Sequence, residues 1–381
     1  MRLAIISNVA ACSWAGSEEL WLATALEALQ SGHHVTACLH GDLHSAEPLK
    51  AFKKAGGDLI NWSRLPIARF EKARQALFPQ FIAQRLGNPD VLLISLGALQ
   101  AMNYVPGLVE YLLKTQTPFV IICQFNSDAL AISTRERHVT RMVLERSHSV
   151  IFVSEQNRSL ARRQYALELL NSQVIPNPIR IKLDSPLPWR VADRQVVFGC
   201  VARFETLWKG QDLLLEILAT ELWRSRNWKL KFFGDGPDLE HVKNYAKMLR
   251  LEGQVTFEGY VRDVQKIWSE AHIMVLPSRG EGTPLAILEA MMCGRPVVTT
   301  DVGGNLEVLE EGITGWIADA ATPRSFAQAM ERAWINRDKW EKMGLSAHEK
   351  ALQLSGTKPD KVLLDILTGA RRQNFYQSFT L

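Results

Sequence analysis

The chain of 381 residues lacks the features that mark several special classes of protein. It has no run of about 18 or more apolar residues, so no helix is expected to span a bilayer. Its five cysteines form no C-x-x-C pair and several stand in apolar runs, which predicts buried, reduced thiols. The net charge of +4 is too small to indicate binding to nucleic acid, but it is compatible with anionic small ligands.

Metal-binding and targeting signals are also not indicated. We interpret the cysteines and histidines as showing no ligand spacing, so neither a structural nor a catalytic metal is expected. The start of the chain, Met1–Ile6, faintly resembles a signal peptide, but the apolar stretch is short and Asn8 interrupts it. A first buried strand in a cytoplasmic protein is therefore the expectation.

Short apolar runs alternate with longer helical patterns along nearly the whole chain, as in a parallel sheet built from strand–helix–strand units. Four prolines between Pro176 and Pro188 interrupt this alternation and indicate a linker. We predict two similar α/β domains, residues 1–177 and 195–355, joined by a linker over 178–194. A helix over about 360–378 could cross back to the first domain, which the sequence alone does not decide.

The expected elements follow the apolar pattern. In the first domain the strands are Leu3–Ile6, Val35–Leu39, Val91–Ile94, Phe119–Cys123 and Val150–Val153, and the first helix is Ser17–Ser31. In the second domain the strands are Val196–Val201, Leu230–Phe233, Val255–Phe257, Ile273–Leu276, Val297–Thr299 and Gly315–Ile317. Helices are expected over residues 209–222, 237–251, 284–293 and 323–335, and in the tail.

The most informative segment is Glu-Gly-Thr-Pro-Leu-Ala-Ile-Leu-Glu, from Glu281 to Glu289. It follows the strand expected at Ile273–Leu276, and Pro284 suits the first position of a helix whose N-cap would be Thr283. Glu281 then lies in the loop and Glu289 on the helix, so both carboxylates can reach one ligand from different directions. Such carboxylates are good acceptors for sugar hydroxyls; the alternative is two solvated glutamates.

Cations and glycines follow other strands of the second domain. Arg203 comes directly after the strand at Val196–Val201, and Lys209 is expected at the start of the next helix. An arginine fork and a lysine point charge at one sheet edge can neutralise a diphosphate, and two isolated surface cations are the alternative. Gly234 belongs to a Gly-Asp-Gly-Pro turn, where glycine either lets a flat ligand lie against the backbone or only serves the turn.

The loop after the first strand contains small residues, Ala15, Gly16 and Ser17, that let the backbone approach a ligand. Ser17 is expected to cap the following helix, and Glu18 to favour its N-terminus. Helix capping without any ligand is the alternative. This loop has no G-x-G-x-x-G fingerprint of a dinucleotide site.

Together these residues resemble the retaining GT-B glycosyltransferases of glycosyltransferase family 4. The resemblance covers nearly the whole chain and is strongest from Val196 to Ala318, where Asp301–Glu307 and Gly312–Trp316 add to it. It implies a GT-B fold of two Rossmann-like, doubly wound domains that face each other across a cleft. It also implies hexosyl transfer from a nucleotide-diphosphate sugar, UDP- or GDP-linked, held mainly by the second domain.

The resemblance implies a role for each matching residue. Glu281 would contact the transferred sugar, and Arg203 and Lys209 would bind the diphosphate and stabilise it as it leaves. The remaining donor contacts would come from Glu289 at the ribose hydroxyls, Gly16 at the diphosphate, Gly234 at the turn, Arg262 near the nucleobase, and the backbone near Thr283, Leu285 and Ala286. In the first loop Ala15 replaces the first glycine of the family's Gly-Gly-x-Glu.

The chemistry that the resemblance implies follows from charge. Breaking the anomeric bond puts negative charge on the diphosphate, so fixed cations and helix N-termini aimed at it act where charge develops. No D-x-D pair occurs, and the protein's own cations are expected to replace a divalent metal. No metal and no other cofactor is expected. The family retains anomeric configuration, by attack on the face from which the diphosphate departs.

One position departs from the family pattern. Many members carry a histidine beside the donor sugar, where this chain has Gln124 or Asn126. Either amide can hydrogen-bond a sugar hydroxyl, but neither can act as a base. An epimerase or phosphorylase on the same fold is one alternative, and the lack of an acid or base here counts against the epimerase. A non-catalytic nucleotide-sugar-binding protein is the other, and the retained Glu281 and Lys209 count against it.

The acceptor is the least specified part of the reaction. A basic, partly amphipathic segment, Arg64–Arg74, is hypothesised to begin a helix that faces a membrane surface or an anionic, lipid-linked acceptor. An ordinary solvated helix face is the alternative. The resemblance implies a glycan, lipid-linked or small-molecule acceptor and a role in polysaccharide biosynthesis, in the cytoplasm or peripherally on the inner membrane face.

Overall fold

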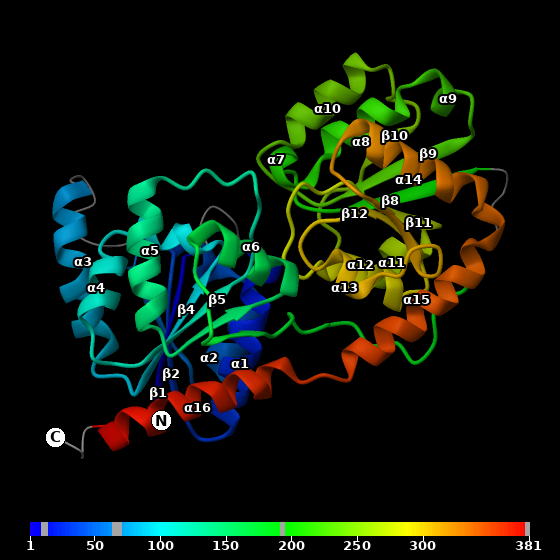
Figure 1. Cartoon of the computed structure of the whole chain (residues 1–381). Coiled ribbons are helices and arrows are strands. Elements are labelled where there is room, and N and C mark those ends of the chain that lie inside the picture. The colour runs from blue at the N-terminus through cyan, green and yellow to red at the C-terminus, as the bar shows by residue number, and fades with distance from the viewer. Residues whose placement is uncertain (9–13, 63–70, 191–194, 378–381) are drawn as a thin grey trace. The chain divides into compact units, whose positions relative to one another are not determined.

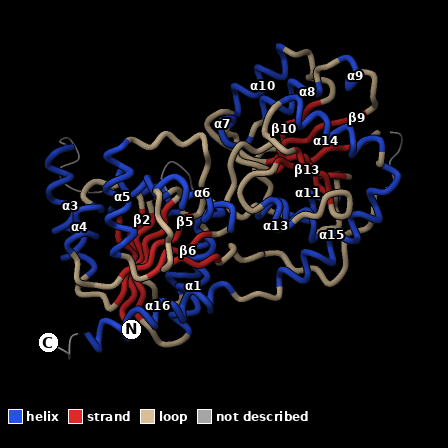
Figure 2. Tube along the Cα trace, in the orientation of Figure 1, coloured by secondary structure: helices blue, strands red, loops and turns tan. Residues whose placement is uncertain are grey.

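The computed structural model describes residues 1–8, 14–62, 71–190 and 195–377 of the chain. These form two compact units, one of Met1–Pro178 with Lys358–Leu381 and the other of Ile179–Thr357 (Figure 1). Each unit is a parallel sheet with helices on both sides, which confirms the predicted α/β class (Figure 2).

The first unit contains a sheet of seven parallel strands in the order β3-β2-β1-β4-β5-β6-β7. The strands are β1 (Arg2–Ser7), β2 (His34–Leu39), β3 (Asp58–Asn61), β4 (Val91–Leu96), β5 (Phe119–Cys123), β6 (Ser149–Phe152) and β7 (Ser172–Val174). Every strand predicted here is present, but β3 and β7 were not predicted. Both are short edge strands that are only partly buried, so they lack a continuous apolar run.

Helices cover both faces of this sheet and bury one apolar core on each face. They are η1 (Gly16–Glu18), α1 (Glu19–Gln30), η2 (Gly41–Ser45), α2 (Pro48–Lys54), α3 (Glu71–Leu86), η4 (Leu99–Tyr104), α4 (Leu108–Lys114), α5 (Thr134–Arg146), α6 (Glu155–Tyr165) and α16 (Pro359–Gln377). The last helix, α16, packs against α1 (Figure 1) and buries Leu363 and Leu367 in the core on that face. Helix α16 is therefore part of the first unit, although it follows the second unit in the sequence.

The second unit contains a sheet of six parallel strands in the order β10-β9-β8-β11-β12-β13. The strands are β8 (Val196–Val201), β9 (Trp228–Phe233), β10 (Val255–Phe257), β11 (Ile273–Leu276), β12 (Val297–Thr300) and β13 (Gly315–Ala318). The predicted strands match these to within two residues at either end. The sequence signal is strongest for a strand such as β11, which is buried at every residue and reads as a continuous apolar run.

The helices of the second unit are α7 (Thr206–Lys209), α8 (Gln211–Leu218), α9 (Glu221–Arg224), α10 (Leu239–Met248), α11 (Val264–Ser269), α12 (Leu285–Met292), α13 (Asn305–Val308), α14 (Pro323–Ile335), η5 (Arg337–Lys339) and α15 (Trp340–Ser355). The single helix predicted over 209–222 is wrong, because Gly210 adopts φ +65° and separates α7 from α8. Lys209 therefore ends a short helix instead of beginning a long one. The N-cap of α12 is Pro284, not Thr283.

The segment that enters the second unit packs on that unit's core through Ile179, Leu187 and Trp189, among others. Arg295, which is fully buried, donates hydrogen bonds to the Leu187 and Pro188 carbonyls. Part of the segment predicted as a linker is therefore fixed to the second unit. A buried arginine can serve this purpose because its five N–H donors can all meet carbonyl oxygens.

Four of the five cysteines lie in the described residues, and all four are buried with free thiols: Cys38, Cys123, Cys200 and Cys293. Burial raises the pKa of each thiol to about 12, so none is poised to react as a thiolate. Cys12 lies outside the described residues. Within the described ranges, no helix combines the length and the apolar character needed to cross a bilayer.

Candidate functional site

The order of strands in the second unit reverses between β8 and β11, which are neighbours in the sheet although β9 and β10 separate them in sequence. In doubly wound sheets, ligands bind beyond the carboxyl ends of the strands at such a reversal. Arg203 and Lys209 follow β8, and Glu281 follows β11. The topology therefore places the predicted cations and the first predicted glutamate at one edge of one sheet.

Lys209 and Glu281 are in direct contact. The Lys209 Nζ lies 2.7 Å from the Glu281 Oε1, and the Ser278 hydroxyl donates to the same oxygen at 2.6 Å. The side chains are 23% and 8% exposed, so this ion pair is largely shielded from water. The carboxylate of Glu281 thus orients the lysine ammonium, which is a role that the sequence analysis did not assign to it.

The short helix α7, which carries Lys209, is held by two residues that the sequence analysis missed. The Asp238 Oδ2 accepts from the Thr206 N–H at 2.8 Å and from its hydroxyl at 2.9 Å. Arg279 donates from its side chain to the Thr206 carbonyl at 2.6 Å, and from its backbone N–H to the Trp208 carbonyl at 2.7 Å. The turn before Lys209 is therefore fixed at both ends.

Arg279 also forms a bidentate ion pair with Asp212 in the first turn of α8. The two N–H···O distances are both 2.9 Å. No local sequence signal identifies this pair, because 67 residues separate its members. It becomes visible only when β8 and β11 are known to be neighbours.

Arg203 lies directly beyond β8 with its side chain 30% exposed. Its Nε is 2.9 Å from the Glu205 Oε1, and its carbonyl accepts from the Gln211 side chain at 2.8 Å. The backbone of this residue is thereby tied to the start of α8. Arg203 thus lies in the loop between β8 and α7, the short helix that Lys209 ends.

The Gly234 turn packs tightly against the loop of Arg203. Gly234 has φ +138°, and a Cβ there would lie 2.1 Å from the Ala202 carbonyl oxygen. A Cβ at Gly236 would lie 2.5 Å from the Phe204 carbonyl oxygen. Close approach of two loops thus accounts for these glycines, which favours the structural alternative. Arg262 is exposed in the loop after β10, and Gly259 of that loop accepts from the Gly234 N–H at 2.8 Å.

The Glu281 loop rests on the segment that follows β12. Gly303 has φ +54°, and a Cβ there would lie 2.3 Å from the Glu281 carbonyl oxygen. The Gly304 N–H donates to the Gly282 carbonyl at 2.7 Å, and the Thr300 hydroxyl donates to the Ser278 carbonyl at 2.6 Å. The Gly-Gly pair therefore fixes the backbone on which Glu281 stands.

The start of α12 presents backbone donors. In the part of the chain that the structure describes, the N–H groups of Leu285 and Ala286 have no hydrogen-bond partner. Thr283, just before the helix, is buried, and Glu289 lies one turn along it with a half-buried side chain. Two N–H donors and a positive helix end thus stand beside the loop of Glu281.

In the first unit, Gly16 is exposed at the start of η1, and Ser17 does not cap α1. The prediction for Ser17 is wrong because a turn of 3₁₀ helix comes first and α1 begins only at Glu19. Glu18 is fully buried, where it accepts from the Ser7 hydroxyl at 3.1 Å and from the Trp21 indole at 2.9 Å. Burial raises the pKa of this carboxyl to about 7, so it is not the solvated helix-end charge that the sequence suggested.

The two amides of the first unit differ in their availability. Asn126 donates to the Asn157 carbonyl at 3.4 Å and accepts from the Ser127 N–H at 3.0 Å. Gln124 is only 4% exposed, yet within the described residues neither its amide oxygen nor its amide nitrogen has a partner. Gln124 is therefore the stronger candidate for a polar ligand contact, since a buried amide without a partner is costly.

Other candidate features give weaker support for a functional site. His40 and His44 do have an i, i+4 spacing, but the His40 ring packs on Trp62 and the His44 Nε2 lies 3.3 Å from the Ile60 carbonyl oxygen. No group of three or more potential metal ligands occurs among the described residues. Most of the basic segment 64–74 lies outside them, and the structure describes no side chain within it.

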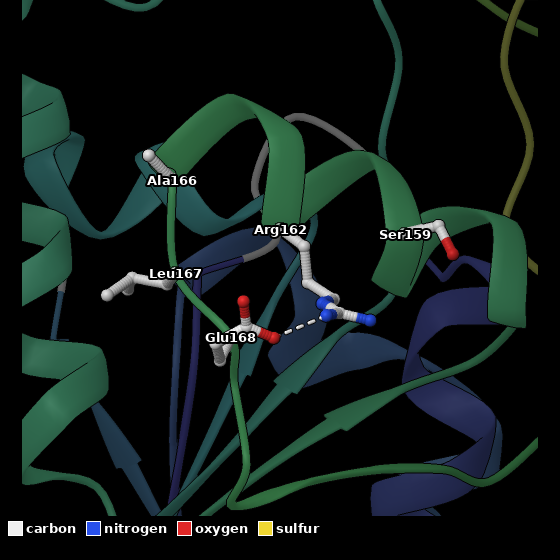
Figure 3. Close-up of a pocket in the computed structure, with 5 residues that line it drawn as sticks. All are labelled: Ser159, Arg162, Ala166, Leu167 and Glu168. Carbon is white, nitrogen blue, oxygen red and sulfur yellow. Dashed lines mark hydrogen bonds and ion pairs between the residues drawn. The ribbon is translucent and has the colours of Figure 1, made fainter.

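A pocket of the first unit lies at the end of α6, lined by Ser159, Arg162, Ala166, Leu167 and Glu168 (Figure 3). Arg162 and Glu168 form an exposed ion pair of 2.5 Å across it. The C-terminal end of α6 leads back to the amino edge of the sheet, where β7 begins. This pocket is therefore at the edge opposite to the carboxyl ends of the strands.

Residues 195–336 match the family model for glycosyl transferases group 1, so the second unit carries a domain of that family. The chain is 32% identical over 143 residues to an exopolysaccharide phosphotransferase of Streptomyces coelicolor, covering 37% of this chain and 15% of that protein. It is 31% identical over 165 residues to N-acetyl-alpha-D-glucosaminyl L-malate synthase of Bacillus anthracis, covering 43% and 42%. The matched segments thus span less than half the length of these relatives.

The whole chain resembles solved structures in fold. HepE of Anabaena, in a complex with UDP and glucose, superposes with a TM-score of 0.71 over 99% of both chains, at 17% sequence identity. This similarity confirms the predicted GT-B fold, with two Rossmann-like domains.

Proposed function

We propose that this chain, whose second unit carries a glycosyl transferases group 1 domain, transfers a sugar from a nucleotide-diphosphate sugar to an acceptor hydroxyl. The proposal includes retention of anomeric configuration and no requirement for a divalent metal. The acceptor would be a glycan, a lipid-linked molecule or a small molecule. The proposed donor is UDP- or GDP-linked, and UDP is tried first because HepE was solved with UDP.

The contact between Lys209 and Glu281 is the observation that carries the proposal. It joins the loops that follow β8 and β11, the two strands at the reversal of the sheet. The N–H groups of Leu285 and Ala286, which have no partner among the described residues, stand in the same loop region. A cation, a carboxylate and two N–H donors fit the diphosphate and the sugar of one donor molecule.

In the proposed reaction, the bond between the anomeric carbon and the diphosphate oxygen breaks, and a bond forms between that carbon and the acceptor oxygen. The proton of the acceptor hydroxyl passes to the departing diphosphate. Negative charge grows on the diphosphate as it leaves, and Lys209 and Arg203 would stabilise it there. One preorganised donor of this kind is worth about 3 kcal/mol to the transition state.

Glu281 would have two functions in this reaction. Its Oε1 orients the ammonium of Lys209, and its carboxylate would contact a hydroxyl of the transferred sugar. Glu289, one turn into α12, would accept from the ribose hydroxyls. In the first unit, Gly16 and the amide of Gln124 remain the predicted contacts, and Asn126 is the weaker candidate because its amide is already bonded. A membrane contact through residues 64–74 stays a prediction.

The test compares two matched lysines. Lys231 is ion-paired with Glu270 at 2.6 Å and is 22% exposed, which closely matches the 2.7 Å pair and 23% exposure of Lys209. Purified wild-type protein, Lys209→Ala and Lys231→Ala are screened by thermal shift with UDP-, GDP- and ADP-sugars. Release of the nucleoside diphosphate from the best binder is then measured with and without EDTA.

We expect a nucleotide sugar to raise the melting temperature of the wild type and to be turned over in EDTA. Lys209→Ala should lower turnover by a factor of about 100 or more, because a preorganised cation is lost. Lys231→Ala should retain wild-type turnover. Binding without any turnover would favour the non-catalytic alternative, and equal turnover in the two variants would refute the role of Lys209.

A further inference from the structure

We propose that Arg279 is a positioning residue, which holds α7 at a fixed angle to α8 and thereby sets the ammonium of Lys209 against Glu281. This inference rests on the proposed function, in which Lys209 binds the donor diphosphate. It assigns Arg279 no contact with the donor.

The joint that Arg279 would fix is the connection between α7 and α8, which lies at Gly210. This residue ends α7 and begins α8, and its φ of +65° turns the chain between them. A Cβ at Gly210 would lie 2.2 Å from the Pro277 carbonyl oxygen, so the joint also presses against the end of β11. Because α7 is a single turn of four residues, its own hydrogen bonds cannot define its direction.

Arg279 spans this joint. On one side its side chain donates to the Thr206 carbonyl, and its backbone N–H donates to the Trp208 carbonyl, both in α7. On the other side its guanidinium forms the bidentate pair with Asp212 in α8. One planar fork with several donors thus binds the two helices that Gly210 separates, which a lysine could not reproduce.

The same residue also ties α7 to the loop of Glu281. Arg279 precedes Glu281 by two residues, so its bonds to α7 fix the spacing between the loop that carries the carboxylate and the turn that carries Lys209. The 2.7 Å contact of Lys209 with Glu281 is the result of that spacing. The clamp of Arg279 and Asp212 therefore acts on the donor only through Lys209.

The test uses an ion pair of the same geometry as a control. Arg226 binds Glu331 in a bidentate pair with distances of 2.7 and 2.8 Å, in the same unit but in contact with α14. The variants are Arg279→Ala, Arg279→Lys, Asp212→Asn, Arg226→Ala and the double variant Arg279→Ala with Lys209→Ala. The affinities for UDP and for uridine, which lacks the phosphates, are measured by calorimetry together with the melting temperature.

We expect Arg279→Ala to weaken UDP binding about tenfold, the effect of one misplaced charge-assisted contact, and to leave uridine binding unchanged. Arg279→Lys should restore part of the affinity, and Asp212→Asn should lose part of it, so folding failure of one variant does not end the test. Arg226→Ala should lower the melting temperature with UDP affinity retained. In the Lys209→Ala background, Arg279→Ala should add less than about a twofold loss.

Two results would overturn the inference about Arg279 and leave the proposed function intact. One is an equal effect of Arg279→Ala and Arg226→Ala on UDP affinity, and the other is a full effect of Arg279→Ala when Lys209 is already absent. A wild-type protein that binds none of UDP, GDP and ADP would instead overturn the proposed function, and this inference with it. If GDP or ADP is the binder, it and its nucleoside replace UDP and uridine in the same measurements.

Discussion

Glu18 gives the prediction that the structure quantifies best. Its carboxyl is fully buried beside β1, where Ser7 and Trp21 donate to it. Burial raises its pKa from 4.5 to about 7. The perturbation is Glu18→Gln, which keeps the size of the side chain and can still accept from Trp21 while its amide donates to the Ser7 hydroxyl.

The direction in which stability changes with pH depends on whether the folded or the unfolded protein holds the proton on Glu18. Between pH 4.5 and pH 7 the folded protein keeps the proton on Glu18 while the unfolded chain releases it, so stability falls as the pH rises through this range. Above pH 7 both states have released the proton, so the contribution of Glu18 to stability no longer changes with pH. The raised pKa of Glu18 corresponds to about 3 kcal/mol of stability, most of which is lost between pH 5 and pH 8.

The assay is amide hydrogen exchange in α1 and β1, corrected for intrinsic rates, at pH 5 and pH 8. Relative to the wild type, Glu18→Gln should become more stable by about 2 to 3 kcal/mol between pH 5 and pH 8, because glutamine does not titrate. Amides of β8 in the second unit serve as an internal control. Glu47→Gln, at an exposed site of the first unit, is the matched variant and should show no such change.

A difference between Glu18→Gln and the wild type that stays constant within about 0.5 kcal/mol from pH 5 to pH 8 would refute this reasoning. Such a result would mean that the carboxyl of Glu18 is hydrated in the folded protein, either because water penetrates to it or because the structure rearranges around it.

Three further predictions concern the second unit. Glu289→Ala should weaken UDP binding about tenfold but leave binding of 2′,3′-dideoxy-UDP unchanged, if the carboxylate accepts from the ribose. Gly303→Ala should lower UDP affinity and the melting temperature, because the new Cβ meets the Glu281 carbonyl. The control is Gly312→Ala, at φ +73° with nothing within 4 Å of the new Cβ, which should cost only about 1 to 2 kcal/mol of backbone strain. Arg295→Met should destabilise the second unit in urea by about 3 kcal/mol or more, since carbonyls of the entering segment lose their donor; retained stability would contradict this.

The sequence by itself determined the α/β class and every strand except the edge strands β3 and β7. Strands such as β5 and β11 are buried at every residue, so each reads as an uninterrupted apolar run whatever its neighbours are. It also determined which loops follow strands, and therefore which polar residues could meet at a sheet edge. These signals are local, because burial on both faces and the positions of proline and glycine are written in adjacent residues.

Only the tertiary structure decided which of those residues meet and in what state. Lys209 and Glu281 are 72 residues apart, and their contact depends on β8 and β11 becoming neighbours. The same pairing makes Arg279 a clamp across Gly210, although neither residue stands out in the sequence. Glu18 reads as a helix-end charge, but packing buries it and changes its pKa. Spatial neighbours and desolvation set these properties, and both depend on how the strands are ordered in the sheet.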